Sequence, residues 1–221
     1  MSAGDFLADM ATSSRDRSEA ARVRVPVSEL RARVRDLPPV PRLRLSPQGF
    51  DLIAEMKLRS PAVGALRDAR CEDVTQRVLA YADAGAAAVS VLTEPSRFDG
   101  DLVHLAQAAA ALAPHGIPAM RKDFLVDPYQ VLEARAAGAG GVLLILRMLP
   151  RAALEALLDA ALEHGLFVLL EAFDVEDIEC RNEVGVAFEN AVVDGSDREF
   201  PLPSGTIIER IHAVAGQEDQ P

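Results

Sequence analysis

Residues 141–172, GVLLILRMLPRAALEALLDAALEHGLFVLLEA, decide the fold class of this 221-residue chain. They begin with an apolar run, continue with leucines at helical spacing and end with a second apolar run. This order predicts a strand over Gly141–Leu146, a helix over Arg151–His164 and a strand over Leu166–Ala172. A strand, a helix and a strand in succession are typical of a parallel sheet that is covered by helices.

The same alternation extends toward the N-terminus as far as Asp51. It predicts strands over Asp51–Lys57, Ala87–Leu92 and Ile117–Arg121 and helices over Asp101–Ala113 and Asp127–Gly138. Successive strands begin about 24 to 36 residues apart, close to the spacing of the eight units in a barrel of about 250 residues. We therefore predict an α/β fold of the TIM (βα)8-barrel type, which is incomplete because residues 51–221 have room for about six units.

The first 50 residues differ from the rest of the chain. Residues Val27–Arg35 predict a polar helix, and the prolines between Leu37 and Pro41 end it. We interpret residues 1–50 as an N-terminal extension that packs against a barrel domain of residues 51–221.

The composition restricts the compartment and the partners. The chain carries 34 acidic and 23 basic side chains, a formal net charge of −11, which argues against nucleic acid or an anionic membrane as a partner. Two cysteines, Cys71 and Cys180, stand far apart and predict neither a disulfide framework nor a metal site. No apolar run approaches the roughly 18 residues of a membrane span, and no signal-peptide pattern is recognisable, so we expect a cytoplasmic protein.

Four charged residues stand where predicted strands end, which is the end at which TIM barrels carry their chemistry. Glu55 and Lys57 share one side of the first strand, Lys122 ends the third, and Glu171 ends the fifth. Buried charges that lie close together spread their pKa values, so one group can donate a proton while another accepts it. The alternative is structural: the pairs Lys57–Glu55 and Lys122–Glu171 fill the polar upper layer of the barrel.

The order of the residues around these positions is more specific than their type. The chain contains IAEMKLRSP at 53–61, AVSVLTE at 88–94, FDG at 98–100, RKDFLVDPYQ at 121–130 and EAR at 133–135. In this order and spacing, from about Val25 to about Asp177, it resembles indole-3-glycerol phosphate synthase. Phosphoribosylanthranilate isomerase, another sugar-phosphate enzyme on a barrel, is disfavoured because its pattern lacks RKDF and EMK…SP.

The resemblance implies an enzyme of tryptophan biosynthesis, a lyase without a metal or an organic cofactor. Its phosphorylated small-molecule substrate would be 1-(2-carboxyphenylamino)-1-deoxyribulose 5-phosphate, which loses carbon dioxide and water to form indole-3-glycerol phosphate. In that family's terms, Lys122 is the general acid at the keto oxygen, and Lys57 faces the anthranilate carboxylate. Glu171 would assist the dehydration, and Glu55 would hold the lysine network.

Three further residues match substrate-binding positions of that family. Phe98 and Phe124 correspond to aromatic residues of the anthranilate pocket, and Ser60 corresponds to a serine near the phosphate. Each has an ordinary alternative, which is core packing for the two phenylalanines and a turn before Pro61 for the serine.

The chain is family-like to about residue 177 and divergent from about residue 178. Motifs of the Gly-Ile-Asn-Asn-Arg and Ser-Glu-Ser-Gly-Ile types, which the late strands of the family carry, are not recognisable in residues 179–221. The spacing there predicts a strand over Val184–Val193, a loop over Gly195–Gly205 and a helix over Gly205–Val214. The alternative function is a truncated, non-catalytic or weakly active relative, which binds a ligand or self-associates through open barrel edges.

Overall fold

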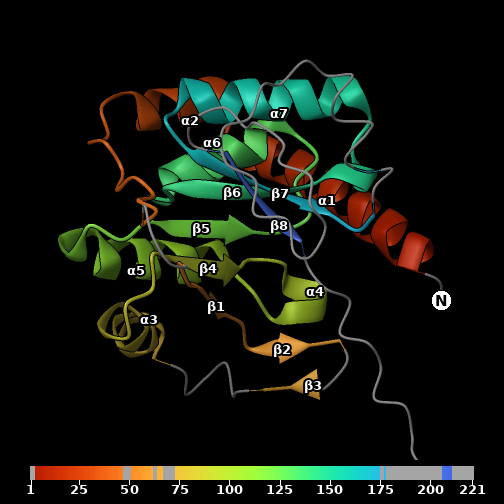
Figure 1. The fold of residues 1–221 in the computed structure, drawn as a ribbon. Helices are drawn as coiled ribbons and strands as arrows, with labels where there is room; N and C mark the ends of the chain where they lie inside the picture. Colours follow the sequence, from red (N-terminus) through yellow and green to blue (C-terminus); the bar gives the residue numbers. More distant parts are fainter. Residues whose placement is uncertain are drawn as a thin grey trace, which may run out of the picture.

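The computed structural model describes residues 3–46, 51–61, 64–66, 73–174, 177 and 206–210. Its central feature is a parallel sheet of six strands (Figure 1). The strands are β1 (Ile53–Met56), β4 (Ala88–Leu92), β5 (Ala119–Lys122), β6 (Gly141–Ile145), β7 (Phe167–Ala172) and β8 (Thr206–Arg210). Each strand pairs in parallel with the next one in that order. The sequential parallel order is that of a TIM-barrel wall, so the predicted fold class is confirmed.

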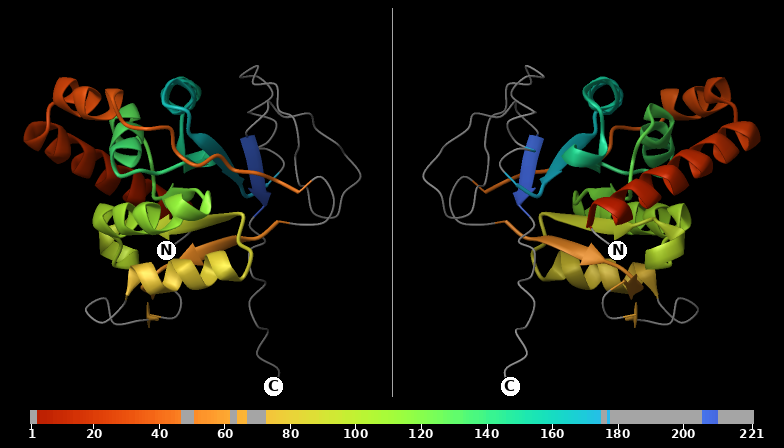
Figure 2. Two further views of the ribbon diagram at one scale, coloured as in Figure 1. Left: turned by 90° about the vertical axis from the view of Figure 1, so that its left-hand side faces the viewer. Right: turned by 90° about the vertical axis from the view of Figure 1, so that its right-hand side faces the viewer.

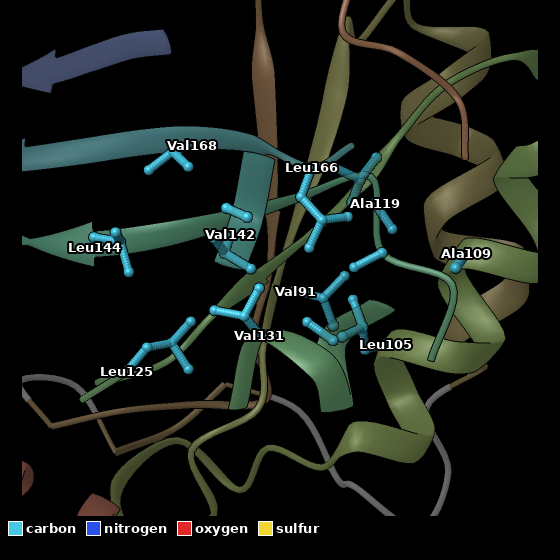
Figure 3. Close-up of a cluster of buried hydrophobic side chains, with 14 of the residues drawn as sticks. Val91, Leu105, Ala109, Ala119, Leu125, Val131, Val142, Leu144, Leu166 and Val168 are labelled. Carbon is cyan, nitrogen blue, oxygen red and sulfur yellow. The ribbon is translucent and has the colours of Figure 1, made fainter. Parts of the chain in front are cut away.

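Four helices connect these strands and cover one face of the sheet. They are α3 (Val74–Asp83), α5 (Leu102–Leu112), α6 (Pro128–Ala136) and α7 (Arg151–Glu163). Side chains from the helices, such as Leu105 and Val131, pack against Val91, Val142 and Leu144 of the strands in one buried core (Figure 3). The helices predicted from residues 101, 127 and 151 onward are therefore confirmed, whereas α3 was not predicted.

Short elements shape the connections at the carboxyl ends of the strands. They are the hairpin of β2 (Arg59–Ser60) with β3 (Gly64–Ala65), the helix α4 (Pro95–Phe98) and the 3₁₀ turn η2 (Leu146–Met148). A further 3₁₀ turn, η1 (Ala113–His115), follows α5 and leads to the amino end of β5. Within this set, β2 and α4 follow β1 and β4 directly and lie in contact with each other. Both therefore stand at the end of the sheet where the candidate residues were predicted.

The opposite face of the sheet is the inner face of the barrel wall. Alternate strand residues, among them Ala88, Met120 and Leu143, form a second buried cluster on this face. Gly141 lies beside Phe167 in the pairing of β6 with β7, and a Cβ at Gly141 would stand 2.4 Å from the Phe167 ring. The glycine therefore leaves the space that the ring fills.

The N-terminal extension consists of two helices, α1 (Ala3–Arg24) and α2 (Val27–Arg35). The predicted helix over residues 27–35 is confirmed, and α1 was not predicted. One end of α1 places Leu7 and Met10 in the inner cluster, and its other end places Ala21 in a third cluster with residues of α2 and α6. Figure 2 shows both helices beside α6. Within the described ranges, no helix is long and apolar enough to cross a membrane.

The C-terminal prediction needs a correction. The helix predicted over Gly205–Val214 is wrong, because residues Thr206–Arg210 form β8, which pairs in parallel with β7 from Val168 to Ala172. The β-branched run Thr-Ile-Ile has strand propensity, and the exposed edge of β7 offers it backbone partners, which outweighs the helical spacing of the isoleucines. The strand predicted over residues 184–193, the loop predicted over residues 195–205 and both cysteines lie outside the described residues.

Candidate active site

Three of the predicted charged residues meet at the carboxyl ends of β1 and β5. The Nζ of Lys57 donates to Glu55 Oε1 at 2.5 Å, and the Nζ of Lys122 donates to Glu55 Oε2 at 2.7 Å. Each oxygen of the Glu55 carboxylate therefore holds one ammonium group. The three side chains are partly buried, with 36%, 28% and 20% of their surface exposed for Lys57, Glu55 and Lys122 respectively.

Strand register brings these groups together. Strand β4 lies between β1 and β5, and it pairs Ser90 with Glu55 on one side and Leu92 with Lys122 on the other. The Ser90 side chain is buried, and its Oγ has no hydrogen-bond partner among the described residues. Sequence reasoning gave this serine no role, although its place in a predicted strand beside Glu55 marks it as a polar residue of the same layer.

The two lysines control the ionisation of Glu55. Partial burial by itself would raise the pKa of this carboxyl, but the charges and hydrogen bonds of Lys122 and Lys57 outweigh it and hold the pKa below its ordinary value. Glu55 is therefore a carboxylate over the neutral range. The three groups together carry two positive charges and one negative charge, which suits an anionic ligand.

The sequence contains no other lysines. All remaining basic residues among the 23 are arginines, so both lysines of the chain lie in this cluster. An arginine keeps its proton in proteins, whereas a lysine can release and regain one. The cluster therefore contains the two side chains among these 23 that can readily exchange a proton. This distribution is a signal that the sequence analysis did not use.

A second network surrounds Asp123, the residue that follows Lys122 at the end of β5. The carboxylate of Asp123 is fully buried and accepts hydrogen bonds from Arg17, Thr93, Arg121 and the backbone N–H of Phe124. Burial alone would raise the pKa of Asp123, yet the positive charges of Arg121 and Arg17 and the Thr93 hydroxyl lower it to about 2. Sequence reasoning quoted Asp123 within the RKDF segment but did not assign it this role, and it missed Arg17 entirely.

The predicted aromatic residues also lie together. The ring centroids of Phe98 and Phe124 are 6.3 Å apart, and Phe6 of α1 meets Phe124 edge to face at 5.8 Å. Helix α4 positions Phe98, because Glu94 caps its first turn by accepting from the backbone N–H groups of Ser96 and Arg97. Phe6 is a member of the set that the sequence analysis missed.

Glu171 and Ser60 occupy the same end of the sheet from other elements. Glu171 is buried near the end of β7 and pairs in register with Ile145 of β6. Ser60 lies in β2, whose neighbour Arg59 approaches Asp99 at the end of α4 with 3.8 Å between the charged atoms. The roles in catalysis and phosphate binding that were predicted for these two residues stay predictions.

The arrangement supports proton transfer next to an apolar surface. It combines two ammonium groups, a carboxylate between them, the buried carboxyl group of Glu171 on β7, two strands from the β5 strand of Lys122, and an aromatic cluster. Such a set can bind an aromatic anion, protonate an oxygen of it and remove a proton from it. Among the described residues, no group of three or more His, Cys, Asp or Glu side chains is arranged to hold a metal ion.

Comparison with known proteins finds a family that the chain matches. Residues 7–188 match the family model described as indole-3-glycerol phosphate synthase. The match begins earlier than the quoted motifs indicate, so it includes most of α1. It also extends past Asp177 into residues that the structure does not describe.

Curated relatives with the same description are similar over large parts of the chain. The protein of Methanopyrus kandleri is 45% identical over 142 residues, which are 64% of this chain and 54% of the relative. That of Salinibacter ruber is 40% identical over 177 residues, 79% of this chain and 64% of the relative. That of Saccharopolyspora erythraea is 43% identical over 164 residues, 73% of this chain and 59% of the relative. The chain thus matches little more than half the length of these relatives.

Proposed function

Because the chain belongs to the indole-3-glycerol phosphate synthase family, we propose that it closes an indole ring. The substrate is 1-(2-carboxyphenylamino)-1-deoxyribulose 5-phosphate, and the products are indole-3-glycerol phosphate, carbon dioxide and water. The observation that carries the proposal is the bridge of Glu55 between Lys57 and Lys122 beside the aromatic cluster. Proton donors and an aromatic surface at the same end of the sheet support the proposal, since the substrate carries an anthranilate ring.

The first step forms a carbon–carbon bond. The ring carbon that bears the carboxylate attacks the keto carbon of the sugar, and Lys122 donates a proton to the keto oxygen, which becomes a hydroxyl group. Lys57 faces the substrate carboxylate until the carbon–carbon bond breaks and carbon dioxide leaves. Glu55 keeps both ammonium groups at 2.5 and 2.7 Å from its own oxygens, so the acid is held in place before the substrate arrives.

The second step is the dehydration. The new hydroxyl group leaves as water, and a proton leaves the substrate to complete the aromatic ring. We assign assistance in this step to Glu171, because it is a buried carboxyl group at the same end of the sheet. Phe98 and Phe124 line the slot for the aromatic ring, and Ser60 contacts the phosphate.

The test uses the absence of tryptophan from the chain, since the fluorescence of the indole product is then read without a tryptophan background, and excitation above the tyrosine band avoids the two tyrosines. Purified wild-type protein mixed with the substrate is expected to develop indole fluorescence. Lys122→Ala is expected to lower kcat by about 100-fold or more, the usual contribution of a general acid. Arg33→Met, which removes a surface ion pair with Glu29 on α2, is the matched control and is expected to keep the activity.

Two results would overturn the proposal. One is a folded wild-type protein, verified by circular dichroism, that forms no indole product at any substrate concentration. This result would favour the non-catalytic, ligand-binding alternative, whose self-association is then measured by size-exclusion chromatography with light scattering. The other is a folded Lys122→Ala variant with unchanged kcat, which would remove Lys122 from the mechanism.

A further inference from the structure

The N-terminal helix α1 is bonded to the loop that follows the candidate acid Lys122. The contacts are spread along the helix and its C-terminal end, and they reach five residues of the segment from Asp123 to Gln130. They are Phe6 on Phe124, Ser14 Oγ with Gln130 Nε2, Arg17 on Asp123, Arg22 on Asp127, and the carbonyl oxygens of Ala21 and Val25 with the Tyr129 hydroxyl. Two of these contacts are ion pairs, and that of Arg17 with Asp123 is the more buried one and involves the residue directly after Lys122.

The geometry of this ion pair is bidentate. The Nη2 of Arg17 donates to Asp123 Oδ1 at 2.8 Å, and its Nη1 donates to Oδ2 at 3.1 Å. The guanidinium plane therefore fixes both the position and the rotation of the carboxylate. The Asp123 side chain is 0% exposed, and that of Arg17 is 27% exposed. The pair is thus shielded from the solvent that weakens exposed ion pairs.

Through Asp123, this constraint reaches the residues before and after it in the chain, Lys122 and Phe124. Its Oδ1 accepts from the N–H of Phe124 at 2.8 Å, and its Oδ2 accepts from the Thr93 hydroxyl at 2.8 Å. The N–H of Thr93 donates in turn to the carbonyl oxygen of Lys122 at 3.0 Å. The peptide on each side of Asp123 is therefore tied to the same carboxylate, directly or through Thr93.

We propose that Arg17 is a positioning residue, which acts through Asp123 to hold the Lys122 ammonium group against Glu55. The inference rests on the proposed function, since it assigns α1 a part in placing the general acid of that reaction. Arg17 need not contact the lysines itself to act in this way. It fixes the backbone from which Lys122 projects, as the bond of Lys122 Nζ to Glu55 fixes the other end of the side chain.

Kinetics of three variants test the proposal. Arg17→Met keeps the apolar stem and removes both hydrogen bonds, Arg17→Lys restores the charge without the bidentate geometry, and Arg22→Met is the control on the same helix. Because a small displacement of a catalytic group lowers the rate strongly, Arg17→Met is expected to lower kcat about tenfold, with KM changed less than about twofold. Arg17→Lys is expected to recover part of the loss, and Arg22→Met is expected to match the wild type.

The acid side of the pH profile supplies a second kinetic readout. Lys122 and Lys57 are the charged groups that lower the pKa of Glu55. If Lys122 moves away in Arg17→Met, the pKa of Glu55 rises toward its ordinary value, and the fall of activity on the acid side begins at a higher pH. A variant that is merely less stable loses activity without this displacement, once the pH range is limited to that in which it stays folded.

An activity-independent arm separates this proposal from the proposed function. Protein labelled with ¹³C at the lysine ε-carbon gives two side-chain signals, which Lys57→Arg assigns, because the chain has only two lysines. The Lys122 signal is expected to shift in Arg17→Met, to return partly in Arg17→Lys and to stay in place in Arg22→Met. An inactive wild type with this pattern would refute the proposed function alone. Unchanged kcat or an unchanged Lys122 signal in folded Arg17→Met would overturn the role of Arg17; if that variant does not fold, Arg17→Lys decides in the same way.

Discussion

The substitution Asp123→Asn tests how much the buried network around Asp123 contributes to the stability of the fold. An asparagine side chain has nearly the same size as the aspartate, so the packing is kept while the negative charge is lost. Arg121, whose side chain is 3% exposed, then faces a neutral amide, and Arg17 loses its charged partner. Removing one partner of a buried ion pair costs about 3 to 5 kcal/mol of unfolding free energy when the other charge stays buried without compensation. Because Arg121 keeps its ion pair with Glu133 at 3.2 Å, we expect a cost at the lower end of this range.

The pH dependence of the unfolding free energy gives a second expected magnitude for the contribution of Asp123. The pKa of Asp123 is about 2 in the folded chain and 3.8 ordinarily, and one pKa unit corresponds to about 1.4 kcal/mol. Since the folded pKa is the lower one, the stabilisation is complete above pH 3.8 and is lost as the pH falls toward 2. The wild type is therefore expected to lose about 2 kcal/mol through this group between pH 5 and pH 2.

Urea unfolding, followed by circular dichroism at pH values from 6 to about 2, measures both quantities. The difference in unfolding free energy between wild type and Asp123→Asn is expected to be largest near neutral pH and to narrow by about 2 kcal/mol toward pH 2. Asp159→Asn, at an exposed carboxylate on α7, is the control. A difference that stays constant over the whole pH range would refute the assignment of the low pKa to Asp123.

Two further substitutions address the site and the sheet. Glu55→Gln is expected to lower kcat about tenfold or more, because the amide holds the ammonium groups less strongly. In the wild type, the low pKa of Glu55 places the acid-side fall of activity below the ordinary carboxyl range. This fall is expected to vanish from the pH profile of Glu55→Gln. Gly141→Ala forces a Cβ to 2.4 Å from the Phe167 ring and is expected to cost about 1 to 3 kcal/mol in urea unfolding. The double variant with Phe167→Leu is expected to recover part of that loss, and equal stability of Gly141→Ala and wild type would contradict the overlap.

The fold was predictable where one local pattern and the tertiary environment agree. The strand of residues 167–172 is buried throughout, and its largely apolar sequence predicts this burial directly. Helix α1 gives no such signal, because Leu7 and Met10 contact the inner cluster while Ala21 contacts a separate one with α2 and α6. Its apolar residues serve two surfaces and therefore do not form a single stripe. Strand β8 was misassigned for the related reason that its partner is β7, which local spacing does not encode.

The candidate site likewise has a part that the sequence predicts and a part that depends on tertiary contacts. Alternation along β1 places Glu55 and Lys57 on one side, and the end of β5 supplies Lys122, so the lysine cluster follows from the sequence. The bond of Lys122 to Glu55 depends on the register of β4 between the two strands, which local spacing does not encode. Arg17 reaches Asp123 across 106 positions of the chain, a distance at which no spacing rule operates.

The use of two kinds of cation connects these networks. Arg17 and Arg121 surround Asp123, where the structure needs charges that are permanent and donors that point in fixed directions. Lys57 and Lys122 surround Glu55, where the proposed reaction needs protons that leave and return. The two carboxylates are otherwise alike, since cations lower the pKa of each. Under the proposed function, arginine surrounds the carboxylate that holds the backbone and lysine surrounds the carboxylate that faces the chemistry, which agrees with the use of lysine at these two positions alone.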